Sequence, residues 1–210
     1  MDEVILAQGR ERRPPWNKGR VIGQKRPLRQ RDIHAIRTRL QIAHNVRETA
    51  MFDLALDSKL RGSDLLGLHV RNIWQGNHVL SRASVTTKKT GCNVRFEITP
   101  DTRKEVTAWI EQEHLQPDDC VFPSRHNHEV ALSMRQYTRI VHKWVESAAL
   151  DSPLYGTHTM RRTKPTLIYR RTKDIRAVQI LLGHKRLEST IRYLGVLEED
   201  ALSISEQEEL

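Results

Sequence analysis

Residues 181–195 read LLGHKRLESTIRYLG, and they hold a histidine and a tyrosine nine positions apart in an otherwise ordinary amphipathic stretch. Gly183 precedes the histidine and is expected to end a helix, because glycine adopts the left-handed conformation found after helix C-termini without steric cost. The turn would let the next helix present Tyr193 toward His184. Whether Tyr193 is a packed aromatic or a nucleophile then depends on what the rest of the chain supplies.

The composition indicates a globular protein without a membrane span. The chain has 210 residues, of which 38% are hydrophobic and 29% charged, and this length suits one domain with a real core. No apolar run approaches the roughly 20 residues that cross a bilayer, and the acidic first residues do not resemble a secretory signal. Cys92 and Cys120 fit no metal-binding or disulfide spacing. We therefore expect a cytoplasmic protein.

The charge of the chain is strongly positive and unevenly distributed. Lysine and arginine number 35 against 26 aspartates and glutamates, which gives a formal net charge of +9. Residues 196–210 contain six acids and no basic residue, so residues 1–195 carry +15. Such a surplus favours a polyanionic partner, and nucleic acid is the first candidate. General solubility is the alternative that charge alone leaves open.

Composition divides the chain into three parts. Residues 1–28 mix proline, glycine and basic residues without helical or strand period, which is typical of a flexible basic arm. The arm either tracks DNA or is a plain disordered leader. Residues 29–195 carry the periodic segments of a folded domain. Residues 196–210 form either an acidic tail or a docking helix, because apolar residues recur in them at helical spacing.

Hydrophobic periodicity predicts a mainly helical domain of the α+β class. Apolar stripes and cap residues predict helices over 31–45, 47–60, 63–68, 99–115, 132–150, 158–171, 173–182 and 187–194. Alternation of apolar and polar residues predicts a small antiparallel sheet, in which the turn TKKTG joins strands over 78–85 and 93–99. Ser63 and Thr99 are the expected N-caps of their helices.

A tyrosine that attacks a DNA phosphodiester makes definite demands on its surroundings. Negative charge grows on the phosphate oxygens, and arginine stabilises it best because guanidinium stays charged and grips phosphate with two hydrogen bonds. A lysine can protonate the leaving 5′-oxygen. The tyrosine has an ordinary pKa near 10, so an imidazole or a water must help to remove its proton. This chemistry needs no metal and no other cofactor.

Three further segments supply these groups. SKLRGSDLLGL places Arg61 where one helix ends and a short one begins. In HTMRRTKPTLIYRRT, His158 and Arg161 are three residues apart and therefore share one helical face. TTKKTG holds Lys88 and Lys89 in the turn between the two strands.

In this order and spacing the segments resemble the tyrosine recombinase, or phage integrase, family. That family shows an arginine in a G-L-R-x-S-E segment, a lysine in a β-turn, an H-x-L-R box, an L-G-H box and a tyrosine nine residues after that histidine. Here KLRGSD has Asp64 in place of the glutamate, HTMR has Met160 in place of the leucine, and LGH is unchanged. The similarity covers about residues 31–195, essentially a whole catalytic domain.

The resemblance implies roles for the cations around the phosphate. Arg61 and Arg161 would clamp the scissile phosphate. The family pattern of lysine before Thr-Gly favours Lys89 as the acid that protonates the departing 5′-hydroxyl. Four basic residues close to these positions are the expected DNA contacts, namely Lys88, Arg162, Lys185 and Arg186.

The resemblance also implies the nucleophile and the partners. His158 and His184 would hydrogen-bond the phosphate and assist proton movement at Tyr193. Tyr193 would form a 3′-phosphotyrosine bond that retains the energy of the ester. Family members act as tetramers on two duplexes, so double-stranded DNA and further copies of this chain are the implied partners. The implied activity is site-specific DNA recombination or integration by a mobile genetic element in the bacterial cytoplasm.

Two other functions stay open. Typical integrases carry a separate core-binding domain before the catalytic one, whereas only some 30 residues precede it here, as in the small recombinases that invert fimbrial switches. A non-cutting DNA-binding regulator derived from a recombinase is the first alternative. A relaxing enzyme of the type IB topoisomerase kind, which needs no partner subunit, is the second.

Pro165 lies inside the helix predicted over 158–171. A proline there removes the hydrogen bond to the carbonyl of Arg161 and costs roughly 3 kcal/mol unless the helix kinks. We therefore expect Pro165→Ala to raise the melting temperature, which thermal denaturation measures. An unchanged or lower melting temperature would contradict this expectation.

Overall fold

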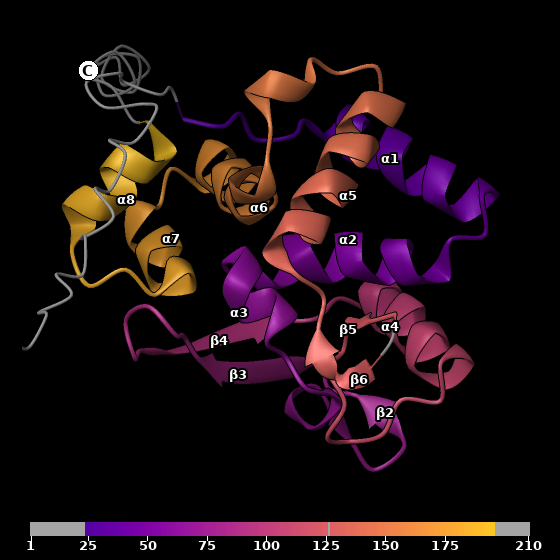
Figure 1. The fold of residues 1–210 in the computed structure, drawn as a ribbon. Coiled ribbons are helices and arrows are strands. Elements are labelled where there is room, and N and C mark those ends of the chain that lie inside the picture. Colours follow the sequence, from indigo (N-terminus) through magenta and orange to yellow (C-terminus); the bar gives the residue numbers. More distant parts are fainter. Residues whose placement is uncertain (1–23, 126, 196–210) are drawn as a thin grey trace, which may run out of the picture.

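The computed structural model describes residues 24–125 and 127–195. They build a mainly helical body with a β-hairpin along one side (Figure 1). The α-helices, in chain order, are α1 (Gln30–Ile42), α2 (Val46–Ser58), α3 (Gly62–Leu66), α4 (Pro100–Gln112), α5 (Met134–Ser147), α6 (Thr157–Thr172), α7 (Ile175–Leu182) and α8 (Leu187–Leu194). Short 3₁₀ turns follow α3 and α5, at Val70–Asn72 and Ser152–Leu154. The predicted α+β class is confirmed.

The strands form separate antiparallel pairs rather than one sheet. Within the described residues these pairs are β1 (Trp74–Gln75) with β2 (His78–Val79), β3 (Arg82–Thr86) with β4 (Asn93–Glu97), and β5 (Pro123–Ser124) with β6 (Asn127–Ala131). The β3–β4 hairpin is the one that alternation predicted, and Val94 and Phe96 are buried while Arg95 is exposed. The other pairs each contain a strand of two residues, which is too short to show a period.

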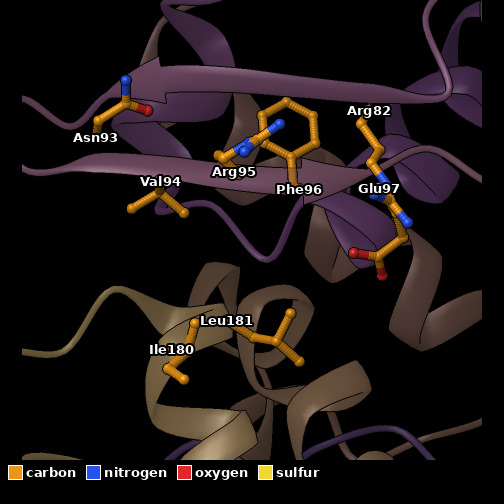
Figure 2. Close-up of a pocket in the computed structure, with 8 residues that line it drawn as sticks. All are labelled: Arg82, Asn93, Val94, Arg95, Phe96, Glu97, Ile180 and Leu181. Atoms are coloured by element: carbon orange, nitrogen blue, oxygen red, sulfur yellow. The ribbon is translucent and has the colours of Figure 1, made fainter.

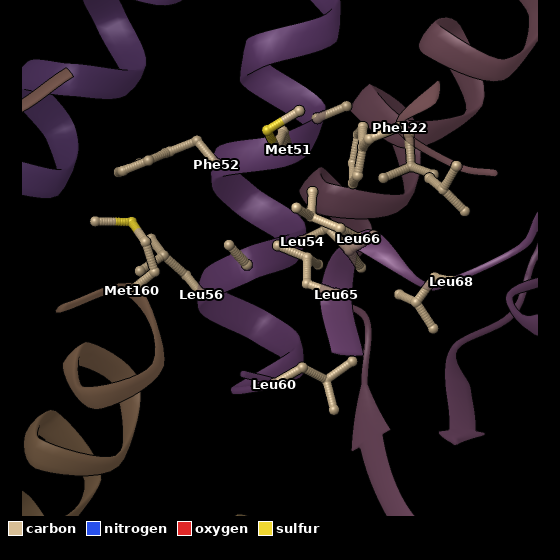
Figure 3. Close-up of a cluster of buried hydrophobic side chains, with 14 of the residues drawn as sticks. Met51, Phe52, Leu54, Leu56, Leu60, Leu65, Leu66, Leu68, Phe122 and Met160 are labelled. Atoms are coloured by element: carbon tan, nitrogen blue, oxygen red, sulfur yellow. The ribbon is translucent and has the colours of Figure 1, made fainter. Parts of the chain in front are cut away.

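Helix α2 lies at the centre of the core (Figure 3). It is buried continuously from Thr49 to Ser58, because α1, α4 and α6 pack around it. Apolar residues therefore occur on every side of this helix, as expected for a helix at the centre of a domain. Each fully buried leucine or phenylalanine side chain stabilises the fold by roughly 1.5–3 kcal/mol. The end of α2 leads directly into α3.

Two local predictions were wrong, and a third was confirmed for the position of the residue but not for its hydrogen bond. Helix α3 begins at Gly62, with Arg61 rather than Ser63 at its N-cap. Thr99 does occupy the N-cap of α4, but its hydroxyl donates to Asp57 Oδ2 at 2.7 Å and does not cap the helix. Helix α1 ends at Ile42 and Ala43 is exposed, although the helix was predicted to continue to residue 45. In the case of Thr99, a partner distant in the sequence took the place of the local interaction.

An ionic network joins α2, β4 and α6. The buried ammonium of Lys59 donates to both carboxylate oxygens of Glu97, at 2.9 and 2.8 Å, and to the carbonyl of Asp57 at 2.6 Å. Lys164 Nζ lies 2.7 Å from Asp57 Oδ1 and 2.7 Å from Glu97 Oε1. Two ammonium groups and two carboxylates balance one another, which makes their burial tolerable. The network therefore fixes α6 against α2 and the hairpin.

The network should make the protein less stable in acid. Burial alone raises the pKa values of Asp57 and Glu97, but hydrogen bonds from their lysine partners outweigh it and hold both pKa values below the ordinary 3.8 and 4.5. A carboxyl whose pKa is lower in the folded state stabilises the fold above its unfolded pKa, and this contribution is lost as the pH falls. Urea titrations should therefore show the free energy of unfolding decreasing from about pH 5 to about pH 3.

Lys164→Met provides the matched comparison for this prediction. It removes one partner of both carboxyls, so their pKa values rise toward the ordinary values. The free energy of unfolding should then depend less steeply on pH, and it should be lower than that of the wild type at neutral pH. Arg71→Ala, which breaks the exposed pair with Asp118, should keep the slope of the wild type. Equal slopes for Lys164→Met and the wild type would contradict the assignment.

Among the described residues, no helix is both long enough and apolar enough to cross a membrane.

Candidate active site

Four of the predicted catalytic residues line one small hollow of about 240 Å³. Arg61 comes from the start of α3, Lys89 from the turn between β3 and β4, and His158 and Arg161 from the first two turns of α6. Thr157, the first residue of α6, also lines it. The positive end of the α6 macrodipole therefore adds to the potential of these side chains. The hollow has the charge that a bound phosphate requires.

The two lysines of the hairpin turn have different surroundings. Lys89 lines the hollow, whereas the side chain of Lys88 lies against Gly67, where its Nζ is 3.1 Å from the position a Cβ would take. The backbone N–H of Lys88 donates to Asp64 Oδ1 at 2.9 Å. The other carboxylate oxygen of Asp64 lies 3.8 Å from Arg61 Nη1. Asp64, which replaces the family's glutamate, thus links the lysine turn to Arg61.

Arg161 is held beneath the end of α7. Its side chain is buried, and its Nη2 donates to the carbonyl of Leu182 at 2.9 Å. Burial lowers the pKa of Arg161, but a guanidinium keeps its charge in proteins. Helix α6 continues through Pro165 to Thr172, and Pro165 is buried. The effect of Pro165→Ala stays a prediction.

Burial and positively charged neighbours lower the pKa of both histidines of the site. Burial and the surrounding cations, Arg161 first among them, lower the pKa of His158. Burial, together with the positive charges of Arg161 and Arg61, lowers the pKa of His184 to about 4. His184 is therefore neutral near pH 7. Its Nδ1 lies 3.1 Å from the hydroxyl oxygen of Thr190.

Helices α7 and α8 bring His184 and Tyr193 together. Helix α7 ends at Gly183 with a φ of 63°, as the sequence predicted, and the chain then turns into α8. The two rings meet edge to face, with centroids 5.4 Å apart. Arg162 lies over the face of the Tyr193 ring, with its Cζ 5.3 Å from the centroid.

Tyr193 has the most strongly perturbed hydroxyl of the site. Its Oη is buried and makes no hydrogen bond of ordinary geometry within the described chain. Burial raises the pKa of Tyr193 to about 12, although Arg161 and Arg162 oppose the rise with their positive charges. The hydroxyl is therefore protonated at neutral pH and close to Arg161 of the same chain. Arg161 thus joins the hollow, which it lines, to the Tyr193 hydroxyl, which lies outside that lining.

Gly183→Ala should destabilise the protein more than an ordinary left-handed glycine would. The φ of 63° at Gly183 is unfavourable for alanine, and a Cβ there would lie 2.6 Å from Val94 Cγ2 of β4. Strain and overpacking together should cost about 2–4 kcal/mol. At this size, that loss lowers the melting temperature by several degrees, roughly 2–4 °C per kcal/mol, as thermal denaturation would show.

Gly195→Ala is the matched control for this substitution. Gly195 ends α8 with a φ of 70°, but nothing lies within 4 Å of its Cβ position. This variant carries the backbone strain without the clash, and its melting temperature should fall less. Val94→Ala combined with Gly183→Ala should recover part of the loss. Equal losses for the two glycine variants would rule out the contact with β4.

The predicted DNA contacts lie in two kinds of surroundings. Lys88, Lys185 and Arg186 are exposed, as phosphate contacts need to be. Arg162 is buried, stacks on Tyr193 and donates from Nη1 to Gln24 Oε1. A DNA-binding role for all four stays a prediction.

Residues 24–28 of the predicted arm pack against the helical body. Gln24 accepts from Arg162 and donates through Nε2 to the carbonyl of Arg192, which precedes Tyr193 in the chain. The N–H of Arg26 donates to the carbonyl of Leu154 at 2.9 Å, and Leu28 is buried in the core. In Figure 1 this segment passes above α6 on its way to α1. Residues 1–23 and the acidic segment 196–210 lie outside the described residues.

A second hollow, of about 590 Å³, lies between β4 and α7 (Figure 2). Val94 and Phe96 come from the hairpin, and Ile180 and Leu181 from α7. None of the predicted catalytic residues lines it. In the described parts of the chain, no group of three or more histidine, cysteine, aspartate or glutamate side chains is placed to hold a metal ion.

Sequence reasoning missed several residues that support the site. Thr190 stands three residues before Tyr193 on α8, and Lys164 stands three after Arg161 on α6. Shared helical faces were a signal for both. Lys59 and Gln24 had no local signal, because their partners are 38 and 138 residues away.

Comparison with known proteins gives one consistent family. The phage integrase family profile matches residues 26–200. The chain is 28% identical over 155 residues to the "Probable integrase/recombinase YoeC" of Bacillus subtilis, covering 74% of this chain and 81% of that protein. It is 29% identical over 172 residues to the "Tyrosine recombinase XerD" of Pasteurella multocida, covering 76% of this chain and 54% of that protein. The chain thus spans about half the length of XerD.

Solved structures show the same fold. The XerA recombinase superimposes with a TM-score of 0.71 at 16% identity, covering 89% of this chain and 66% of that chain. The XerH site-specific recombinase, bound to its palindromic difH substrate, gives a TM-score of 0.68 at 17% identity over 86% of this chain and 52% of that chain. With the family profile matching most of its length, this chain belongs to the phage integrase family.

Proposed function

We propose that the protein is a site-specific DNA recombinase that cuts and rejoins DNA through a 3′-phosphotyrosine at Tyr193. The proposal is carried by one observation. Arg61, Lys89 and Arg161, from three separate segments, line one hollow, and the Tyr193 hydroxyl lies beside Arg161. The names of the relatives, integrase and tyrosine recombinase, agree with this chemistry.

In the first step the Tyr193 oxygen attacks the scissile phosphorus. The bond from phosphorus to the 5′-oxygen breaks, and Lys89 Nζ donates a proton to that oxygen. The tyrosine proton leaves to water or to an imidazole. Arg61 and Arg161 stabilise the negative charge that grows on the phosphate oxygens, and they are already in place before the reaction begins. This prearrangement offsets the high pKa of the buried phenol.

In the second step a 5′-hydroxyl from another strand attacks the phosphotyrosine. The proton of that hydroxyl passes to Lys89, which gave up its proton in the first step. The bond from phosphorus to the tyrosine oxygen breaks, the tyrosine oxygen regains a proton from water or an imidazole, and a new DNA strand is joined without an external energy source. Exchange between two duplexes requires several active sites together, so we propose that the protein works as a tetramer on DNA. We further propose that it acts in the bacterial cytoplasm on the DNA of a mobile element. The solved XerH complex contains the DNA substrate of that recombinase.

A suicide DNA substrate tests the proposal. Duplexes are made from inverted repeats that flank the gene, with a nick placed so that cleavage releases a short oligonucleotide and traps the enzyme. We expect an adduct that survives detergent, and peptide mapping should locate the DNA on Tyr193. A shifted band on a native gel without any adduct would instead support a non-cutting regulator. Relaxation of supercoiled DNA without strand exchange would support a topoisomerase.

A further inference from the structure

Thr190 contacts the imidazole of His184 through its hydroxyl. It lies on α8 and is 0% exposed, and its Oγ1 is 3.1 Å from His184 Nδ1. Within the described chain this is the only hydrogen bond of that hydroxyl, and His184 Nε2 makes none. A single polar contact therefore governs which nitrogen of the ring carries the proton.

The neutral ring has one N–H to place. Burial and the charges of Arg161 and Arg61 lower the pKa of His184 to about 4, so one nitrogen is bare at pH 7. If Nδ1 carried the proton, it would donate to Thr190, and the hydrogen of the buried hydroxyl would have no acceptor among the described residues. If Nε2 carries it, the hydroxyl donates to the bare Nδ1. The second arrangement leaves no buried polar hydrogen of this pair unpaired and is favoured.

We infer that Thr190 is a positioning residue that holds His184 as its Nε2–H tautomer, so that His184 donates a hydrogen bond to the phosphate instead of accepting the proton of Tyr193. The role toward phosphate rests on the proposed function, whereas the tautomer does not. A neutral donor beside Arg61 and Arg161 adds a directed hydrogen bond without adding a third charge to the cluster. The tyrosine proton must then leave by another route.

The tautomer is measured directly on the wild-type protein. Long-range ¹H–¹⁵N correlation spectra of the full-length ¹⁵N-labelled chain at about pH 7 separate a bare nitrogen from a protonated one. The signals of His184 are identified by their loss in His184→Asn. We expect Nδ1 to be bare and Nε2 to carry the proton. A protonated Nδ1 would overturn the inference, whatever the activity of the protein.

Two substitutions of Thr190 test the functional consequence. Thr190→Val keeps the shape but removes the hydroxyl, and Thr190→Ser keeps the hydroxyl. At saturating suicide substrate we expect Thr190→Val to slow adduct formation about tenfold, which corresponds to about 1.4 kcal/mol and to one hydrogen bond. Thr190→Ser should stay within about twofold of the wild type. The affinity for DNA should change little in either variant.

The control and the opposing outcomes are distinct. Thr172→Val removes an exposed hydroxyl that donates to the carbonyl of Ile168 and should leave the rate unchanged. In Thr190→Val the His184 signals should shift toward a mixture of tautomers. If serine fails to restore the rate, or if the tautomer is the same in Thr190→Val, the hydroxyl does not position the ring. If the wild type forms no adduct at all, the proposed function fails while the wild-type spectrum still decides the tautomer.

Discussion

Tyr193→Phe should abolish the covalent adduct while leaving the fold and the affinity for DNA intact. In the proposed mechanism the phenol oxygen forms the bond to phosphorus, and no neighbouring atom of the ring can replace it. We therefore expect adduct formation to fall by at least about 10⁴-fold, below detection on a denaturing gel. Native gels with the same DNA should still show a complex, because the cations of the hollow are unchanged.

The surroundings of the Tyr193 hydroxyl indicate that its removal will not disturb the fold. The Tyr193 Oη is buried and has no hydrogen bond of ordinary geometry in the described chain, so its removal leaves no partner unsatisfied. The ring keeps its contacts with His184 and Arg162. The melting temperature should therefore be equal to that of the wild type or slightly higher.

Tyr169→Phe is the matched control. Tyr169 lies on α6, where Lys173 Nζ is 5.7 Å from its ring centroid. The variant should form the adduct at the rate of the wild type. An adduct that persists in Tyr193→Phe and disappears in Tyr169→Phe would move the nucleophile to α6 and end the proposed mechanism.

Arg161→Ala should have the second largest effect, a loss of about 10²–10³-fold in the rate of adduct formation. Arg161 lines the hollow, lies close to the Tyr193 hydroxyl and is oriented by the carbonyl of Leu182. In the proposed mechanism it therefore acts on the phosphate and on Tyr193 together. Single-turnover assays at saturating DNA separate this loss from weaker binding.

Two further variants sharpen the comparison. Arg161→Lys keeps the charge but loses the two-pronged hydrogen bonding of guanidinium, and it should recover only a small part of the rate. Arg71→Ala removes an exposed arginine that pairs with Asp118, and it should react normally. Because Arg161→Ala leaves the Leu182 carbonyl unpaired at a cost of about 1–3 kcal/mol, the assays belong well below its melting temperature. A loss of less than tenfold would remove Arg161 from the catalytic cluster.

The helices were predictable where their signals are local. The helix predicted over 132–150 is α5, and its apolar residues Tyr137, Val141 and Val145 are buried. Gly183 was expected to end α7 and does so in the left-handed conformation. The ends of α3 and α1 were misplaced by the sequence, since a good capping residue or an apolar neighbour does not by itself decide where a helix starts or stops.

The local grouping of the candidate side chains could also be predicted from the order of the motifs. His158 and Arg161 lie on one helix, where a spacing of three residues places them on the same face. His184 and Tyr193 come together because the chain turns between α7 and α8. These relations follow from 3.6 residues per turn and from the glycine between two helices. The choice of Lys89 over Lys88 followed a family pattern, and the lining of the hollow agrees with that choice.

The sequence by itself therefore determined which side chains are available for phosphate chemistry and on which local elements they stand. Only the tertiary structure decided that α3, the hairpin turn and the start of α6 meet at one hollow, and that Lys59 and Lys164 are network members rather than solvated charges. The reason is physical: local patterns reflect interactions within a few residues, whereas the Lys59–Glu97 and Lys164–Asp57 contacts span 38 and 107 residues. Such contacts form only when the packing of the whole core brings distant segments together.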